Sequence, residues 1–106
     1  MDIADWRHKI DELDRQLVSL INQRAQCALE IGRLKGDSDL PVYEPDRERI
    51  IFENIARNNG GPLSNVQLRQ IFERLVDVMR QIQGEQMMSA KAQEEVSGAN
   101  ELEPLD

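Results

Sequence analysis

The chain has 106 residues, which is room for one domain, and only 4% of them are aromatic, so a core must be built from Leu, Ile, Val and Met. The formal net charge is −7, but residues 1–83 hold 12 Lys and Arg with 14 Asp and Glu, whereas residues 84–106 hold 1 and 6. This charge pattern excludes the basic stripe that nucleic acid requires. One Cys and one His likewise exclude an intrachain disulfide and a zinc set.

The first predicted element is a long amphipathic helix from about Asp5 to Lys35, closed by a cap at Gly36. Its apolar stripe recurs at steps of four and three residues, as in a buried seam: Trp6, Ile10, Leu13, Leu17, Leu20, Arg24, Cys27, Ile31, Leu34. We expect Cys27 to be a small buried residue of this seam. Arg24 is the one cation of this stripe. Burying a guanidinium costs free energy unless an anion pairs with it.

This helix is too long for its domain. It spans ~45 Å, whereas a compact domain of this size is roughly 26 Å across. Because the rest of the chain cannot cover both ends, the length predicts an obligate dimer in which a second copy covers the seam.

Pro45 suits the first position of a second helix that runs to about Asn58, with Ile51 and Ile55 facing inward. Ser64 and Gln67 form a capping box that opens a third helix. Its apolar positions have helical spacing: Leu68, Ile71, Phe72, Leu75, Val76, Met79, Ile82. The sequence therefore predicts an all-α fold with three helices per chain, a helical domain over 1–88, and an acidic tail over 89–106 whose last dozen or so residues are disordered.

Arg24 and Lys35 are eleven residues apart, so they share a helix face ~16 Å apart and could converge on a small dianion. Arg7 lies ~25 Å from Arg24 and could join that site only from the partner of an antiparallel pair. Gln83 falls on the inward face of the third helix. No nucleophile–base set is present, so any enzyme here would use positioned cations and hydrogen-bond donors without covalent or metal catalysis.

Each candidate also has a purely structural explanation. Lys35 could favour the helix C-terminus, and Arg7 could be solvated. Arg24 could pair with Glu30, Glu48 or another carboxylate, and Gln83 could bond a neighbouring backbone group.

Several segments together resemble the all-helical class of chorismate mutases. They are Ile10-Asp11-Glu12-Leu13-Asp14, the mid-helix Arg24, Lys35 at the helix end, Pro41-Val42 followed by Arg47-Glu48, and Ile71-Phe72 with Gln83. The resemblance covers roughly residues 7–83. It implies an interlocked homodimer with two shared sites, and the Claisen rearrangement of chorismate to prephenate without a cofactor.

The resemblance also implies a role for each site residue. Arg24 and the partner's Arg7 would hold the two carboxylates of chorismate. Lys35 would contact a carboxylate and the ether oxygen, to which Gln83 would donate a second hydrogen bond. Glu48, with the backbone near Glu44, would bind the ring hydroxyl, and Arg47 would brace this junction. Met79 stands where some members carry a small polar residue, so we expect it to be only a pocket wall.

Two other functions stay open. One is an isochorismate-pyruvate lyase on the same scaffold, although the loop between Lys35 and Pro41 lacks a second lysine. The other is a regulatory helical module that docks on a shikimate-pathway enzyme. The chain shows no signal-peptide pattern and no apolar run of membrane-spanning length, so we expect a cytoplasmic protein without nucleic-acid or membrane partners.

Overall fold

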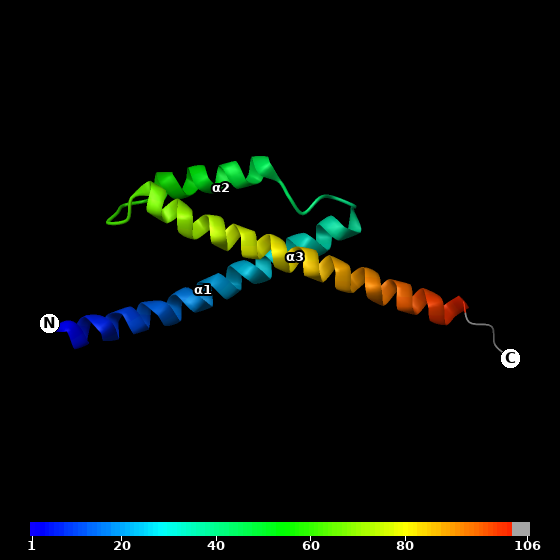
Figure 1. The fold of residues 1–106 in the computed structure, drawn as a ribbon, viewed down its shortest axis with the longest axis horizontal. Coiled ribbons are helices and arrows are strands. Elements are labelled where there is room, and N and C mark those ends of the chain that lie inside the picture. Colours follow the sequence, from blue (N-terminus) through cyan, green and yellow to red (C-terminus); the bar gives the residue numbers. More distant parts are fainter. Residues whose placement is uncertain (103–106) are drawn as a thin grey trace.

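The computed structural model describes the backbone of residues 1–102 and the side chains of residues 1–95. It contains three helices, α1 (Ile3–Asp37), α2 (Pro45–Asn58) and α3 (Asn65–Leu102), and no strand within the described backbone (Figure 1). The all-α prediction with three helices per chain is confirmed. None of the helices described is long and apolar enough to cross a membrane.

Local hydrogen bonds explain where α1 begins and ends. Asp2 and Asp5 form a reciprocal capping box, with N–H···O distances of 2.9 and 3.0 Å. The predicted stop at Gly36 is wrong, because the helix continues to Asp37. The chain instead turns at Asp39, which has a φ of 56°, a left-handed conformation that Asp tolerates better than most residues.

The other two helices begin where the sequence predicts. Pro45 is the first residue of α2, after the extended backbone of Glu44. Ser64 and Gln67 exchange side chain–backbone hydrogen bonds of 3.0 and 3.1 Å at the start of α3, which confirms the capping box. The backbone of α3 is helical as far as Leu102, so the helix extends for several turns into the predicted tail. Residues 103–106 lie outside the described residues, and the disorder expected at this end stays a prediction.

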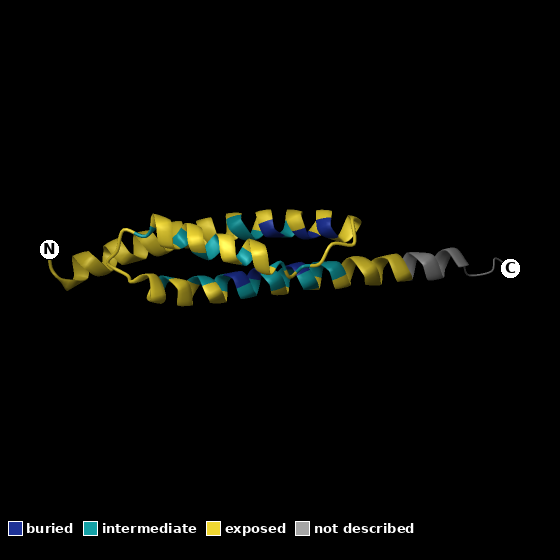
Figure 2. Cartoon of the chain, turned by 90° about the horizontal axis from the view of Figure 1, so that it is seen from above, coloured by how far each residue is buried: buried dark blue, intermediate teal, exposed yellow. Residues whose placement is uncertain are grey.

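The small core lies where α1 and α3 cross. Figure 1 shows α3 running beside α2 and then crossing α1, and Figure 2 shows the buried residues gathered at this crossing. Ala28, Val76 and Met79 are the buried apolar residues of the described part. A Cβ on Gly32 would lie 3.0 Å from Cγ of Gln83, so glycine permits the close approach of the two helices.

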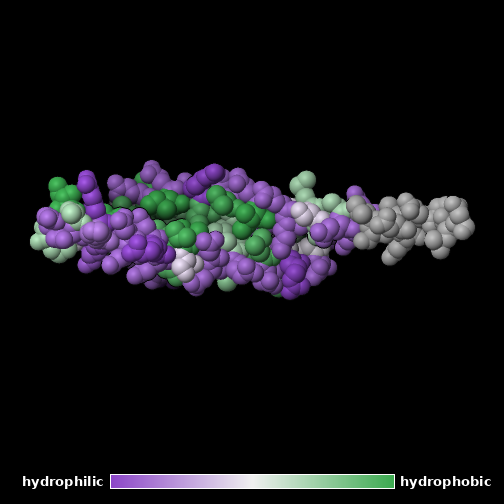
Figure 3. Space-filling view, turned by 90° about the horizontal axis from the view of Figure 1, so that it is seen from below, coloured by the Kyte–Doolittle hydropathy of each residue, from purple (hydrophilic) through white to green (hydrophobic). Residues whose placement is uncertain are grey.

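The apolar seam of α1 is not buried within one chain. Residues 1–23 are all exposed, Leu13 keeps 53% of its surface, and Cys27 is exposed, contrary to our expectation of burial. Figure 3 shows apolar side chains gathered along one face of the molecule between polar borders. The radius of gyration is 20.0 Å, against about 13 Å for a compact domain of this length. A single chain is therefore extended and leaves a large apolar surface uncovered.

Candidate active site

A cavity of about 280 Å³ lies between the second half of α1, the loop after it, the start of α2 and the middle of α3. Six of the seven predicted site residues line it: Arg24, Lys35, Glu44, Arg47, Glu48 and Gln83. Apolar walls are provided by residues that include Ile31, Val42, Ile51, Val76 and Met79. The structure thus brings together residues separated by up to 59 positions in the chain. Met79 is a wall residue, as expected.

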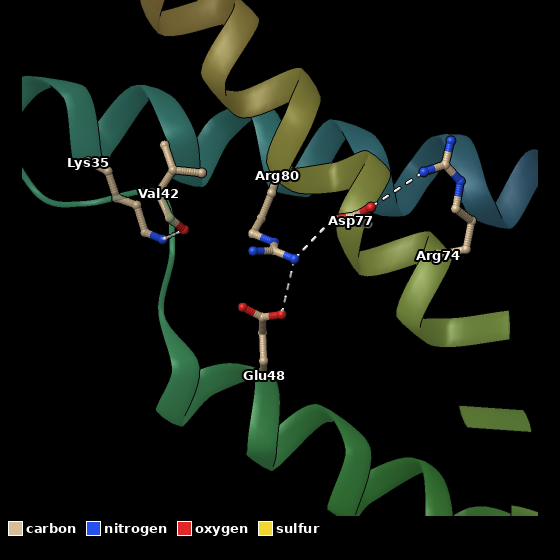
Figure 4. Close-up of polar contacts among 6 residues, drawn as sticks. All are labelled: Lys35, Val42, Glu48, Arg74, Asp77 and Arg80. Atoms are coloured by element: carbon tan, nitrogen blue, oxygen red, sulfur yellow. Dashed lines mark hydrogen bonds and ion pairs between the residues drawn. The ribbon is translucent and has the colours of Figure 1, made fainter. Parts of the chain in front are cut away.

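Lys35 is held at the cavity by the loop that follows α1. It is only 7% exposed, and its Nζ donates to the carbonyl oxygen of Val42 at 3.3 Å and lies 3.4 Å from Oε1 of Glu44 (Figure 4 shows the bond to Val42). An ammonium group has three N–H donors, so even with the Glu44 carboxylate beside it at least one remains for a ligand. Burial and these two contacts fix the position of Lys35. A lysine that only stabilised the C-terminal end of the helix dipole would need neither burial nor such contacts.

Arg24 and Arg47 lie in the same cavity without a carboxylate partner. Glu30 pairs with Arg33 at 3.3 Å, and among the side chains of residues 1–95 no carboxylate lies within ion-pair distance of Arg24 or Arg47. Burial, and then the positive charge of Arg47, lower the pKa of Arg24 from its ordinary value. The structural explanation of Arg24 as half of an ion pair within the described chain is therefore wrong.

Gln83 forms a hydrogen bond to a neighbouring backbone group, as expected if its role is structural. Its Nε2 donates to the carbonyl oxygen of Ala28 at 2.6 Å, which joins α3 to α1 at their crossing. An amide nitrogen carries two hydrogens, so the bond to Ala28 leaves one donor for a ligand in the cavity. The structural and the ligand-binding roles are therefore compatible.

Arg80 also lines the cavity, although sequence reasoning passed over it. Its Nη2 lies 3.7 Å from Oε1 of Glu48 and 3.0 Å from Oδ1 of Asp77. Figure 4 draws both contacts as dashed lines. The signal was present in the spacing, because Arg80 is four residues after Val76 and three before Gln83 on the inward face of α3.

Arg7 is exposed on α1 and does not line the cavity of its own chain. Without it, the cavity holds four cations (Arg24, Lys35, Arg47, Arg80) and two carboxylates (Glu44, Glu48). This excess of positive charge, together with the amide of Gln83, suits a small dianion that needs to be oriented and hydrogen-bonded.

Comparisons with known proteins point to one family. The chorismate mutase type II family matches residues 6–84. The bifunctional chorismate mutase/prephenate dehydratase of Aquifex aeolicus is 35% identical over 79 residues, which are 71% of this chain and 22% of that protein. The chorismate mutase of Methanocaldococcus jannaschii is 33% identical over 55 residues, covering 52% of this chain and 56% of that protein. The chain therefore spans only about a fifth of the length of the bifunctional relative.

A solved structure has the same fold. The Form II structure of chorismate mutase from Thermus thermophilus superposes with a TM-score of 0.76 at 27% sequence identity. The superposition covers 77% of this chain and 93% of the other. The Form I structure from the same organism gives a TM-score of 0.70 at 28% identity.

Proposed function

Because the chain belongs to the chorismate mutase type II family, we propose that it catalyses the rearrangement of chorismate to prephenate, on the route to phenylalanine and tyrosine. The observation that carries this proposal is the cavity in which Arg24 and Arg47 have no carboxylate partner among residues 1–95. Chorismate is a dianion, and one of its two carboxylates would supply the negative charge that Arg24 lacks within the described part of its own chain. The reaction is an intramolecular rearrangement, so it requires no nucleophile, base or cofactor.

Lys35 and Gln83 act on the ether oxygen whose bond to the ring breaks. Negative charge grows on this oxygen in the transition state, so fixed donors beside it lower the barrier. The contacts of Lys35 with Val42 and Glu44, and that of Gln83 with Ala28, hold both donors in place before the substrate arrives. Such preorganisation is what a reaction without covalent chemistry needs.

The remaining residues fold and hold the substrate. Arg24 binds one carboxylate, Arg47 braces the junction at the start of α2, and Glu48, with the backbone near Glu44, accepts a hydrogen bond from the ring hydroxyl. Together they select the folded, chair-like form of chorismate in which the reacting carbons are close.

The second carboxylate requires a homodimer. Arg7 is ~25 Å along α1 from Arg24, so only a second copy can bring an Arg7 to the cavity. The exposed seam of α1 supports this arrangement, since a partner helix would cover it. Sedimentation over a wide dilution range tests it, because a folded, helical monomer would contradict the dimer.

A direct assay of the isolated chain with chorismate tests the activity. We expect chorismate to be consumed and prephenate to appear without added metal or cofactor. A parallel assay with isochorismate separates the mutase from a lyase that releases pyruvate. A folded dimer that converts neither substrate would contradict the proposal and favour a regulatory module.

A further inference from the structure

Arg80 is fixed in the cavity by contacts that do not use its whole donor set. Its Nη2 donates to Oδ1 of Asp77, one turn earlier on α3, at 3.0 Å. Its guanidinium carbon lies 5.0 Å from the centre of the Tyr43 ring, a cation–π contact with the loop before α2. These two contacts hold the guanidinium beside Glu48, which comes from the first turn of α2.

Arg80 and Glu48 face each other without a hydrogen bond between them. Their nearest atoms, Nη2 and Oε1, are 3.7 Å apart, and this Nη2 already donates to Asp77. Nε of Arg80 and Oε2 of Glu48 are both buried and have no hydrogen-bond partner among the described residues. Leaving a buried donor and a buried acceptor unsatisfied is costly. One group that both accepts and donates a hydrogen bond, such as a water molecule or a hydroxyl, would satisfy both atoms.

A hydroxyl group has this chemistry, since its oxygen accepts and its hydrogen donates. A carboxylate would be repelled by Glu48, and an ammonium group would be repelled by Arg80. We propose that Arg80 and Glu48 bind the ring hydroxyl of the substrate together: Oε2 of Glu48 accepts the hydroxyl hydrogen, and Nε of Arg80 donates to the hydroxyl oxygen. Arg80 is then a specificity-determining residue, an inference that rests on the proposed function.

Two substitutions separate the donor of Arg80 from its charge. Arg80→Leu removes both. Arg80→Gln removes the charge but keeps an N–H donor, because the amide nitrogen of Gln stands at the same bond distance from the backbone as Nε of Arg. Arg74→Leu is the matched control: Arg74 bonds the same Asp77 at 3.4 Å, but its side chain is 71% exposed and lies outside the cavity lining.

Each variant is assayed for kcat/KM with chorismate and with an analogue in which the ring hydroxyl is replaced by hydrogen. We expect Arg80→Leu to lower kcat/KM for chorismate on the order of 10- to 100-fold. The same substitution should change the value for the analogue by less than about threefold. Arg80→Gln should recover much of the preference for chorismate, and Arg74→Leu should keep the wild-type preference.

The outcomes distinguish this inference from the proposed function. A wild-type chain that does not convert chorismate refutes both. If the wild type is active, equal losses of the Arg80 variants on the two substrates show that Arg80 acts through charge or folding, and overturn the inference alone. Equal behaviour of Arg80→Leu and Arg80→Gln on chorismate overturns it as well. Circular dichroism of each variant checks the fold, and if Arg80→Leu is unfolded, the preference of Arg80→Gln decides: loss of the preference overturns the inference.

Discussion

The sharpest prediction concerns which chain supplies each arginine of the site. Arg7→Ala and Arg24→Ala homodimers should both be nearly inactive, because each site then lacks one of the two arginines that bind the substrate carboxylates. Seventeen residues separate the two arginines, which is ~25 Å along α1, and Arg24 lines the cavity whereas Arg7 does not. A mixed dimer therefore concentrates both lesions in one site and leaves the other site intact.

The size of the recovery follows from counting. Random pairing of equal amounts of two chains makes half of all dimers mixed, in a two-fold dimer with two sites. Each mixed dimer has one intact site of two, so the mixture should regain about a quarter of wild-type activity. The two variants are unfolded together, refolded, and assayed against the separately refolded homodimers.

A matched mixture supplies the control. Arg24 and Lys35 line the same cavity of one chain, so a mixture of Arg24→Ala with Lys35→Ala leaves one lesion in every site and should not recover. If the Arg7 and Arg24 variants also fail to complement each other after verified subunit exchange, both arginines serve one site within a chain, and the shared-site reasoning is wrong.

Three further predictions test the donors and the helix crossing. Lys35→Ala should lower kcat by about 10²–10³-fold, since it removes a donor to the charge that grows in the transition state; near-normal kcat with only a raised KM would reassign Lys35 to substrate binding. Gln83→Glu should be most active at acid pH, because only the protonated acid can donate to the ether oxygen. A pH-independent Gln83→Glu enzyme with unchanged thermal stability would place that side chain away from the substrate. Gly32→Ala should reduce activity more than it reduces helix content, because its Cβ would press on Gln83 at 3.0 Å; full activity would show that the crossing adjusts freely.

Local chemistry made the helix boundaries partly predictable. Pro45 and the capping box of Ser64 and Gln67 act within a few residues, so their effect can be read without tertiary information. The end of α1 could not be predicted this way. Gly36 is a reasonable stop, but the N–H of Leu40 bonds the carbonyl of Lys35 at 2.8 Å, and Asp39 takes the left-handed turn instead.

The site was partly predictable for a related reason. Arg24 was recognised because a cation interrupts an apolar stripe, and it does line the cavity. The spacing of Arg80 from Val76 and Gln83 places it on the inward face of α3, but its contact with Glu48 of α2 depends on the fold and could not be predicted. Hydrophobic periodicity does not distinguish a helix face that packs within one chain from a face that packs against a second chain. For this reason the pattern predicts burial of Cys27, which is exposed in the single chain.

The first half of α1 has a consequence for how the protein folds. Residues 1–23 are exposed along their whole length, and most of the stability of a helix in a protein comes from the packing of its apolar face. If a second chain covers this segment, folding and association form one equilibrium, and the melting temperature should rise with protein concentration. Refolding should then follow second-order kinetics at low concentration, so the protein concentration would determine how quickly complete active sites form.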